Sequence, residues 1–171
     1  WLVSGLMLGS TICLYDGSPF HPNGYVLWDF AEKERINFFG TSAKYIDALL
    51  KEGLDVRSRY KLLNLNTIGS TGSPLVHESF DYVYKNVKKD VHLASLSGGT
   101  DIVGCFVGGN PLSPVFRGEI QGEILGMDVH VFNDKGESIK NKKGELVCIK
   151  SFPTMPIKFW NDEKDNKYHN A

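Results

Sequence analysis

Apolar positions recur with two different periods in the first hundred residues of the chain. Helical spacing predicts helices at residues 1–9, 25–35, 43–52 and 74–87. Short apolar runs rich in β-branched and aromatic residues predict strands at residues 11–15, 36–39, 65–68 and 91–96. Strands and helices that alternate at this spacing indicate parallel strands joined by right-handed crossovers.

Local signals mark several ends of these elements. The turn residues Asp16–Pro19 end the first strand pattern. Ser42 is a suitable N-cap for the helix that follows it, and Gly53 is a suitable residue to end that helix. Pro74 suits the first turn of the next helix, where its missing N–H is not needed.

Glycines divide the second half of the chain into short apolar runs, which predict strands. The runs cover residues 102–107, 115–121, 127–132 and 145–149. Hairpin-type turns stand at residues 133–136 and 141–144. We therefore expect an α/β fold in two parts. A parallel-sheet α/β layer covers residues 1–101, and a small antiparallel β-barrel-like subdomain covers residues 102–171.

Composition excludes several classes of partner. The 171 residues include 19 Lys and Arg against 20 Asp and Glu, which gives a formal net charge of −1. Without a dense basic stripe, neither a nucleic acid nor an anionic membrane is an expected partner. No apolar run approaches the roughly 20 residues that span a bilayer. We expect a cytoplasmic protein whose partners are small molecules, and its oligomeric state stays open.

The cysteines and the chain ends add two expectations. Cys13, Cys105 and Cys148 are far apart in the sequence, so they indicate neither a zinc site nor a disulfide framework. The chain starts at Trp1 inside a helical pattern and stops at Ala171 without a terminating signal. We therefore expect a piece of a longer protein.

The segment Ser97–Asp101 carries the strongest chemical signal, because it closely follows the apolar run Val91–Ala94. Ligands of open α/β sheets bind at such strand ends. The Thr100 hydroxyl can donate to a phosphate oxygen, and the Asp101 carboxylate can hold Mg²⁺. The two glycines of the segment allow a ligand to approach the backbone. The alternative is a glycine turn in which the threonine and the aspartate cap the next element.

A second glycine-rich loop, Gly69–Pro74, stands between a predicted strand and a predicted helix. Its small residues can pack against a flat ring such as adenine, and a helix N-terminus favours negative charge. The loop lacks the lysine of a nucleoside-triphosphate P-loop. It could equally be a tight strand-to-helix turn. Together the two loops predict one shared site for a phosphate-bearing ligand.

Ser97 supports a different hypothesis, because small residues flank it as they flank the serine of a nucleophile elbow. An elbow needs a helix directly afterwards, whereas residues 102–107 have the pattern of a strand. None of the histidines has a clear partner role. A serine hydrolase that uses Ser97 and a non-catalytic nucleotide-binding module both remain as alternatives.

Six segments, taken in order, resemble the adenylate-forming acyl-CoA synthetase superfamily. They match the middle to late part of its large N-terminal domain, an acetyl-CoA synthetase-like fold. The segments are Leu8–Thr11 with Asp16–Pro19, Gly69–Pro74, Ser97–Asp101, Phe116–Glu119, Gly144–Val147 and Lys167–Ala171. The resemblance implies a ligase that uses ATP and Mg²⁺ to convert a short carboxylic acid to an acyl-adenylate. Coenzyme A then displaces AMP to form the thioester.

The resemblance also implies roles for individual residues. Thr100 and Asp101 are the catalytic pair, in which Thr100 contacts the phosphate and Asp101 holds Mg²⁺. The nucleotide-binding residues are Gly72, Ser73, Pro74, Ser95, Leu96, Ser97 and Thr100. The substrate-binding residues are Thr71, Gly98 and Gly99.

Two departures from the superfamily pattern bear on specificity. Many members have glutamate at the position of Asp101. Acetyl-CoA synthetases carry bulky aromatic residues at the positions of Ser97 and Gly98, so a glycine there should enlarge the acyl pocket for a four-carbon keto acid such as acetoacetate. The superfamily's phosphate loop and catalytic lysine match no segment of this sequence, so we expect the 171 residues alone to be inactive.

Overall fold

The computed structural model describes residues 2–170, which fall into two compact units. The first unit comprises the chain up to Ser97 together with Val107–Gly122. The second comprises Gly98–Phe106 together with the chain from Glu123 onward. None of the helices in this described part is long and apolar enough to cross a membrane.

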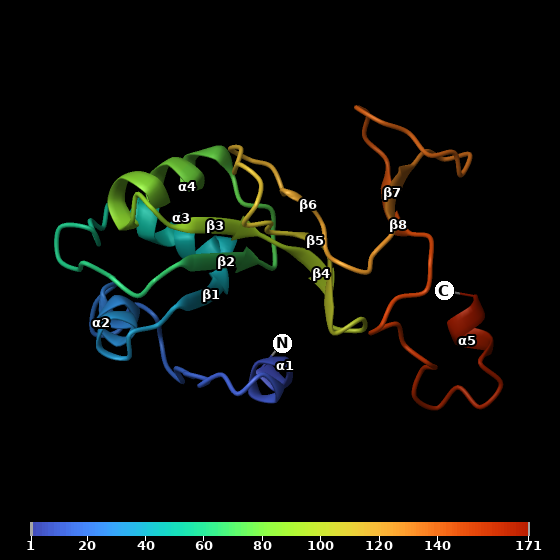
Figure 1. Cartoon of the computed structure of the whole chain (residues 1–171), viewed down its shortest axis with the longest axis horizontal. Helices are drawn as coiled ribbons and strands as arrows, with labels where there is room; N and C mark the ends of the chain where they lie inside the picture. The colour runs from blue at the N-terminus through green and yellow to red at the C-terminus, as the bar shows by residue number, and fades with distance from the viewer. Residues whose placement is uncertain (1, 171) are drawn as a thin grey trace. The chain divides into compact units, whose positions relative to one another are not determined.

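A three-stranded parallel sheet forms the centre of the first unit (Figure 1). Its strands, in spatial order, are β1 (Phe38–Ser42), β2 (Thr67–Thr71) and β3 (His92–Ser95). Phe39, Ile68 and Leu93 stand opposite one another in the register, and all three are buried. The predicted parallel layer is therefore confirmed, and this apolar row is its core-facing side.

The helices of the first unit match the predicted pattern closely. They are α1 (Leu2–Met7), α2 (Val26–Lys33), α3 (Ala43–Lys51), α4 (His77–Tyr82) and the π-helical turn η1 (Val83–Val87). Ser42 is the N-cap of α3, because its side chain accepts a 3.1 Å hydrogen bond from the Tyr45 amide. Gly53 follows α3 with a φ of +63°, which glycine adopts readily. Trp1, part of the first predicted helix, lies outside the described residues.

An aromatic cluster joins α2 and α3 to the sheet. The rings of Trp28 and Phe39 are stacked with centroids 4.8 Å apart, and Tyr45 packs beside both. Burial raises the pKa of Tyr45 well above its usual range, so its hydroxyl stays protonated. The cluster is thus a neutral, tightly packed part of the core.

Two predictions in the first unit are wrong. Residues 11–15 are not a strand; they line a groove beside β1 and form no ladder in the described structure. Strand propensity alone does not make a strand without a pairing partner. The helix predicted from Pro74 begins only at His77, because the backbone of Val76 is extended.

Short strands make up the second half of the chain, as predicted, although not all at the predicted positions. The strands are β4 (Ser97–Gly99), β5 (Gly104–Gly108), β6 (Gly122–Glu123), β7 (Val129–Phe132) and β8 (Glu145–Cys148), and α5 (Asn166–His169) follows. β4, β5 and β6 form one small sheet, and β7 pairs antiparallel with β8. The turn at 133–136 is confirmed, since the Gly136 amide donates to the Asn133 carbonyl at 2.9 Å.

The strand predicted at residues 115–121 is instead a loop held by side chains. Arg117 forms a 2.7 Å ion pair with Asp81 on α4. Gly118 has a φ of +75° and lies against the His77 ring, where a Cβ would be 2.5 Å from Nε2. A positive φ and these contacts to α4 replace the ladder that an apolar pattern alone would favour.

The N-cap of α3 gives a direct test of the local fold. We expect Ser42→Ala to lower the free energy of opening of α3 by about 1 kcal/mol, because the Tyr45 amide loses its acceptor. Amide hydrogen exchange measures this opening. Ser42→Asp keeps an acceptor and is the control. Equal protection of α3 in the alanine variant and the parent would contradict the capping role.

The β7–β8 hairpin should lose stability in acid. The Lys150 ammonium donates to Asp128 at 2.8 Å and, with a smaller contribution from His130, holds the pKa of Asp128 below its ordinary value of 3.8. A carboxyl with a lowered pKa in the folded state stabilises above its unfolded value, and this stabilisation disappears as pH falls through the folded value.

We therefore expect the amide protection of β7 and β8 to decrease when the pH drops below about 4. The Asp128→Asn substitution should remove this pH dependence. The exposed Asp134→Asn variant is the control. An unchanged acid profile in Asp128→Asn would contradict the prediction.

Candidate functional site

The carboxyl ends of β2 and β3 bring two sets of predicted nucleotide-binding residues together in the first unit. Ser70 stands opposite Ser95 in the parallel register, and the Leu96 amide donates to the Ser70 carbonyl at 2.8 Å. The segments Thr71–Pro74 and Ser95–Ser97 therefore leave the same edge of the sheet from neighbouring strands. This edge is where an open α/β sheet binds its ligands.

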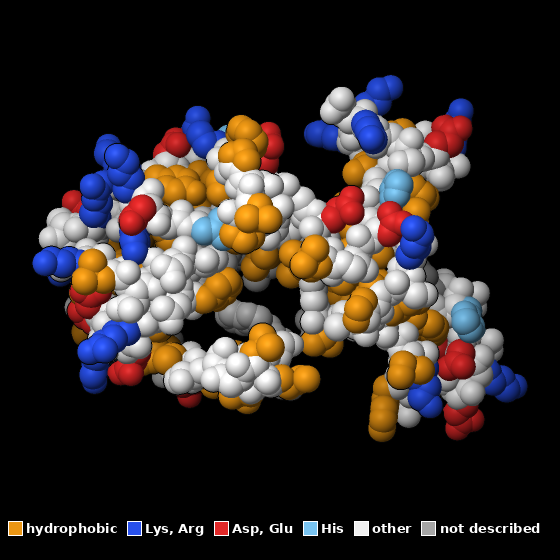
Figure 2. Space-filling view, viewed as in Figure 1, with side chains coloured by type: hydrophobic (Ala, Val, Ile, Leu, Met, Phe, Trp, Pro, Cys, Tyr) orange, Lys and Arg blue, Asp and Glu red, His pale blue; other side chains and the backbone are white. Residues whose placement is uncertain are grey.

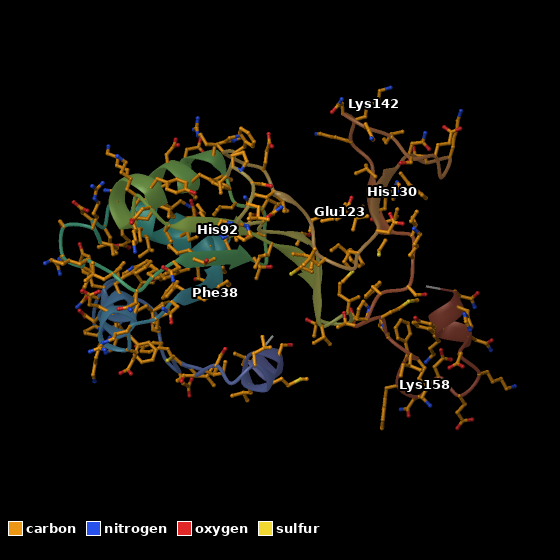
Figure 3. The ribbon with its side chains drawn as sticks, in the orientation of Figure 1. Phe38, His92, Glu123, His130, Lys142 and Lys158 are labelled. Atoms are coloured by element: carbon orange, nitrogen blue, oxygen red, sulfur yellow. The ribbon has the colours of Figure 1, made fainter. Side chains whose placement is uncertain are left out.

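The side chains at this edge divide between the two faces of the sheet. Ser95 is 7% exposed and belongs to the buried face with Leu93. Thr71 and Leu96, one position on in their strands, belong to the opposite face. There Phe38, labelled in Figure 3, packs over Gly69, whose Cβ would lie 2.7 Å from the ring. Ser95 is one of the predicted nucleotide-binding residues. On the sheet face that carries Leu96, it therefore presents only backbone atoms.

A row of hydroxyl groups, which was not predicted from the sequence, crosses the three strands near this edge. Thr41, Ser70 and Ser95 stand opposite one another in the register. The Ser70 hydroxyl is fully buried and has no hydrogen-bond partner among the described residues. The row becomes visible only from the strand register, because each strand contributes a single hydroxyl to it.

Gly72 is the residue of the first loop whose backbone conformation favours glycine. Its φ is +84°, whereas nothing lies within 4 Å of where its Cβ would be. Ser73 and Pro74 follow in a segment without regular structure, which lasts until α4 begins at His77. The expected helix N-terminus therefore does not stand directly behind Ser73.

The residues Gly98–Asp101 belong to the second unit and form the end of β4 and a tight turn. The Val103 amide donates to the Thr100 carbonyl at 3.1 Å. Val103 has a φ of +49°, which is strained for a β-branched residue. Thr100 and Asp101 are both exposed on this turn. Strain of this kind often occurs at ligand-binding loops.

Gly98 is required by the close approach of β5. A Cβ at Gly98 would collide with the Gly104 carbonyl oxygen and lie 2.5 Å from the Cys105 Cα. At Gly99 the nearest atom would be the Asp101 amide nitrogen at 4.0 Å. The absence of a side chain at Gly98 therefore has a backbone-packing reason in addition to any effect on an acyl pocket. Burial raises the pKa of the Cys105 thiol, so this neighbour stays protonated at neutral pH.

Asp101 fits Mg²⁺ in one particular binding mode. Among residues 2–170 no group of three or more His, Cys, Asp or Glu side chains could hold a metal ion. Mg²⁺ is commonly held by one or two carboxylates together with substrate phosphates and waters. The single exposed carboxylate of Asp101 suits that mode, whereas an all-protein metal cage does not fit the described residues.

The elbow hypothesis for Ser97 gains no support from the structure. Ser97 starts strand β4, and the chain continues through a turn into β5. A nucleophile elbow stands between a strand and a helix. The local backbone around Ser97 therefore lacks the geometry that exposes an elbow serine.

Gln121 anchors the loop that follows β5, and the sequence analysis missed this as well. Its Oε1 accepts from His92 Nε2 at 2.7 Å and from the Asn110 amide at 3.0 Å. Its Nε2 donates to the carbonyls of Asn110 and Ser113, each at 2.8 Å. This amide fastens the loop to the start of β3, where His92 is labelled in Figure 3. No helix or strand pattern marks such a contact in the sequence.

A groove of about 1030 Å³ lies beside β1 in the first unit. Residues 10–15 line one part of it and residues 34–42 another, and none of the predicted site residues takes part. Figure 2 shows lysine and arginine side chains interspersed with acidic ones, without a continuous basic stripe on the face drawn.

No family model matches the chain. The acetoacetyl-coenzyme A synthetase of Rhizobium meliloti (strain 1021) is 58% identical over all 171 residues, which correspond to 26% of that protein. The acetoacetyl-CoA synthetase of Xenopus tropicalis is 46% identical over all 171 residues, or 25% of its own length. The chain thus spans about a quarter of the length of these relatives.

Two solved structures are similar. The acetoacetyl-CoA synthetase from Streptomyces lividans has a TM-score of 0.90 and 40% identity, covering 99% of this chain and 27% of that one. The anthranilate CoA ligase AuaEII, solved with anthranoyl-AMP, has a TM-score of 0.75 and 16% identity over 94% of this chain and 30% of that one. The second likeness shows a shared fold.

The two glycines of β4 give a matched pair of variants. We expect Gly98→Ala to destabilise the β4–β5 pair by about 1–3 kcal/mol, because the methyl group displaces the Gly104 carbonyl. Gly99→Ala should change it by no more than about 0.5 kcal/mol. Amide exchange of β5 measures both. Equal effects of the two substitutions would contradict the packing role of Gly98.

Proposed function

We propose that this chain belongs to the acetoacetyl-CoA synthetase family, of whose members it spans about a quarter, and that the full-length protein ligates acetoacetate to coenzyme A with ATP. The observation that carries the proposal is the meeting of Thr71–Pro74 and Ser95–Ser97 at one carboxyl edge of the sheet. The similarity over all 171 residues to acetoacetyl-CoA synthetases supports this proposal. We place the reaction in the cytoplasm, within ketone-body and lipid metabolism.

The nucleotide lies at the carboxyl edge of β2 and β3 in this proposal. Gly72, Ser73 and Pro74 line the adenine from one strand end, and Ser95–Ser97 line it from the other. The positive φ of Gly72 and the absence of a Cβ let the ring approach the backbone. Hydroxyl and backbone groups here orient the nucleotide without changing its charge.

The exposed turn after β4 supplies the phosphate contacts. The Thr100 hydroxyl would donate to a phosphate oxygen, and the Asp101 carboxylate would help to hold Mg²⁺. The ion, when bound, neutralises charge on the phosphates.

The proposed chemistry has two displacements. A carboxylate oxygen of acetoacetate attacks the α-phosphorus of ATP, and the bond to pyrophosphate breaks. The sulfur of coenzyme A then attacks the acyl carbon, and AMP leaves. The acid supplies its own nucleophilic oxygen, so the residues of this chain act by orientation and charge stabilisation.

In the proposal, the resemblance assigns contacts with the acyl group to Thr71 in the first unit and to Gly98 and Gly99 in the second unit. A large side chain at Gly98 should favour acids shorter than acetoacetate. Any side chain there also meets the Gly104 carbonyl, so Gly98→Ala separates the two effects. In the full-length enzyme Gly98→Trp should shift the preference toward acetate, and Gly98→Ala should lower activity with all acids alike. Equal preferences in both variants would contradict the pocket role.

Asp101 can be tested directly. We expect Asp101→Asn to lower the kcat of thioester formation by about 100-fold, because the phosphate charge loses its bound cation. The rate is measured as acetoacetate-dependent AMP release by the full-length enzyme over a range of Mg²⁺ concentrations. Asp134→Asn, at an exposed hairpin turn, is the control. A kcat within about twofold of the parent would contradict the role of Asp101.

A further inference from the structure

Three side chains of the second unit form a hydrogen-bonded line on the β7 hairpin. Ser138 Oγ lies 3.0 Å from His130 Nδ1, and His130 Nε2 lies 3.1 Å from Asp128 Oδ1. His130 is in β7, where Figure 3 labels it, and Asp128 directly precedes that strand. A backbone bridge between Phe132 and Ser138 places the serine beside the strand. The hydrogen-bonded side chains therefore come from two backbone segments that pair with each other.

The two ring nitrogens of His130 have different roles in the neutral state. Nε2 faces a carboxylate, which only accepts, so this nitrogen carries the hydrogen. Nδ1 is then an acceptor, and the Ser138 hydroxyl donates to it. A serine that donates to an imidazole, which in turn donates to a carboxylate, is the arrangement of an activated nucleophile. In a neutral imidazole, one ring nitrogen carries the hydrogen and the other nitrogen accepts.

We propose that Ser138 is an acyl-acceptor site, with His130 as its general base and Asp128 as the group that orients the imidazole. Its substrate class is activated acyl compounds, namely reactive esters and thioesters of short acids. This site differs from Ser97 in position and in geometry, because Ser97 starts a strand of another small sheet. The proposal does not depend on the ligase reaction.

The neighbouring residues keep the Asp128 carboxylate charged and leave the Ser138 hydroxyl accessible. Asp128 accepts from Lys150 through Oδ2 at 2.8 Å and from His130 through Oδ1, so each of its oxygens has a donor. The ammonium stabilises the carboxylate form that the imidazole needs. His130 and Asp128 side chains are 35% and 31% exposed, and Ser138 is exposed. An acyl donor can therefore reach the hydroxyl from solvent.

The proposed step balances as follows. The Ser138 oxygen forms a bond to the carbonyl carbon of the donor, and its proton passes to His130 Nδ1. The bond from that carbon to the leaving alkoxide or thiolate breaks, and the leaving group takes up the proton from the imidazole or from water. The products are an acyl ester on Ser138 and a free alcohol or thiol.

The test uses the full-length protein with p-nitrophenyl acetate as the only reagent, in the absence of ATP and coenzyme A. We expect release of p-nitrophenolate and an acetyl group on the peptide that contains Ser138, found by mass spectrometry. Ser151, exposed in the same unit, is the internal control and should stay unmodified on this timescale. Because ATP and coenzyme A are both absent, a negative result in this experiment does not bear on the ligase proposal.

Variants separate activation from mere exposure. His130→Gln should slow the acetylation of Ser138 by about 100-fold, because the general base is lost. Ser138→Ala should abolish acetylation of that peptide, and Ser138→Cys, which keeps the contact to His130, should restore it. Amide protection of β7 confirms that each variant keeps the hairpin. Acetylation of Ser138 no faster than that of Ser151, or unchanged in His130→Gln, would overturn the proposal.

Discussion

The parallel pairing of β2 between β1 and β3 is the constraint on which the rest of the first unit depends. It sets Phe39, Ile68 and Leu93 in one buried row against the helices. Because the strands are parallel, their carboxyl ends meet at one edge, and the loops after β2 and β3 become neighbours. A shift of one residue in register would turn the apolar row to the other face and separate these loops.

The same pairing explains which elements could be predicted from the sequence. Helices α2 and α3 and the three parallel strands have local signals that agree with their surroundings, such as the Ser42 cap. Residues 11–15 have strand composition but no pairing partner in the described structure. Residues 115–121 have a similar pattern, yet Gly118 and Gln121 hold them as a loop. Pattern alone does not contain these long-range contacts.

The candidate site shows the same limit. Small residues near the strand ends were predictable, because they are local features, whereas the loop assignments were partly wrong: Gly69–Thr71 continue β2, and Ser97–Gly99 form β4. The positive φ of Gly72 and the turn at Thr100 agree with that prediction. By contrast, the collision that a side chain at Gly98 would cause with Gly104 depends on how β5 approaches β4. The contact between Ser138 and His130 depends in the same way on the folding of the hairpin.

The two proposed sites depend on different structural features, a sheet edge and a hairpin. In the two proposals, the edge of the parallel sheet positions groups around a nucleotide, whereas the β7 hairpin activates one hydroxyl through a histidine. The central claim concerns the first. Acid-dependent exchange of pyrophosphate into ATP by the full-length protein, with acetoacetate, acetate, propionate and butyrate compared, tests it most directly. The account predicts exchange that is fastest with acetoacetate, and exchange with none of the four acids would contradict it.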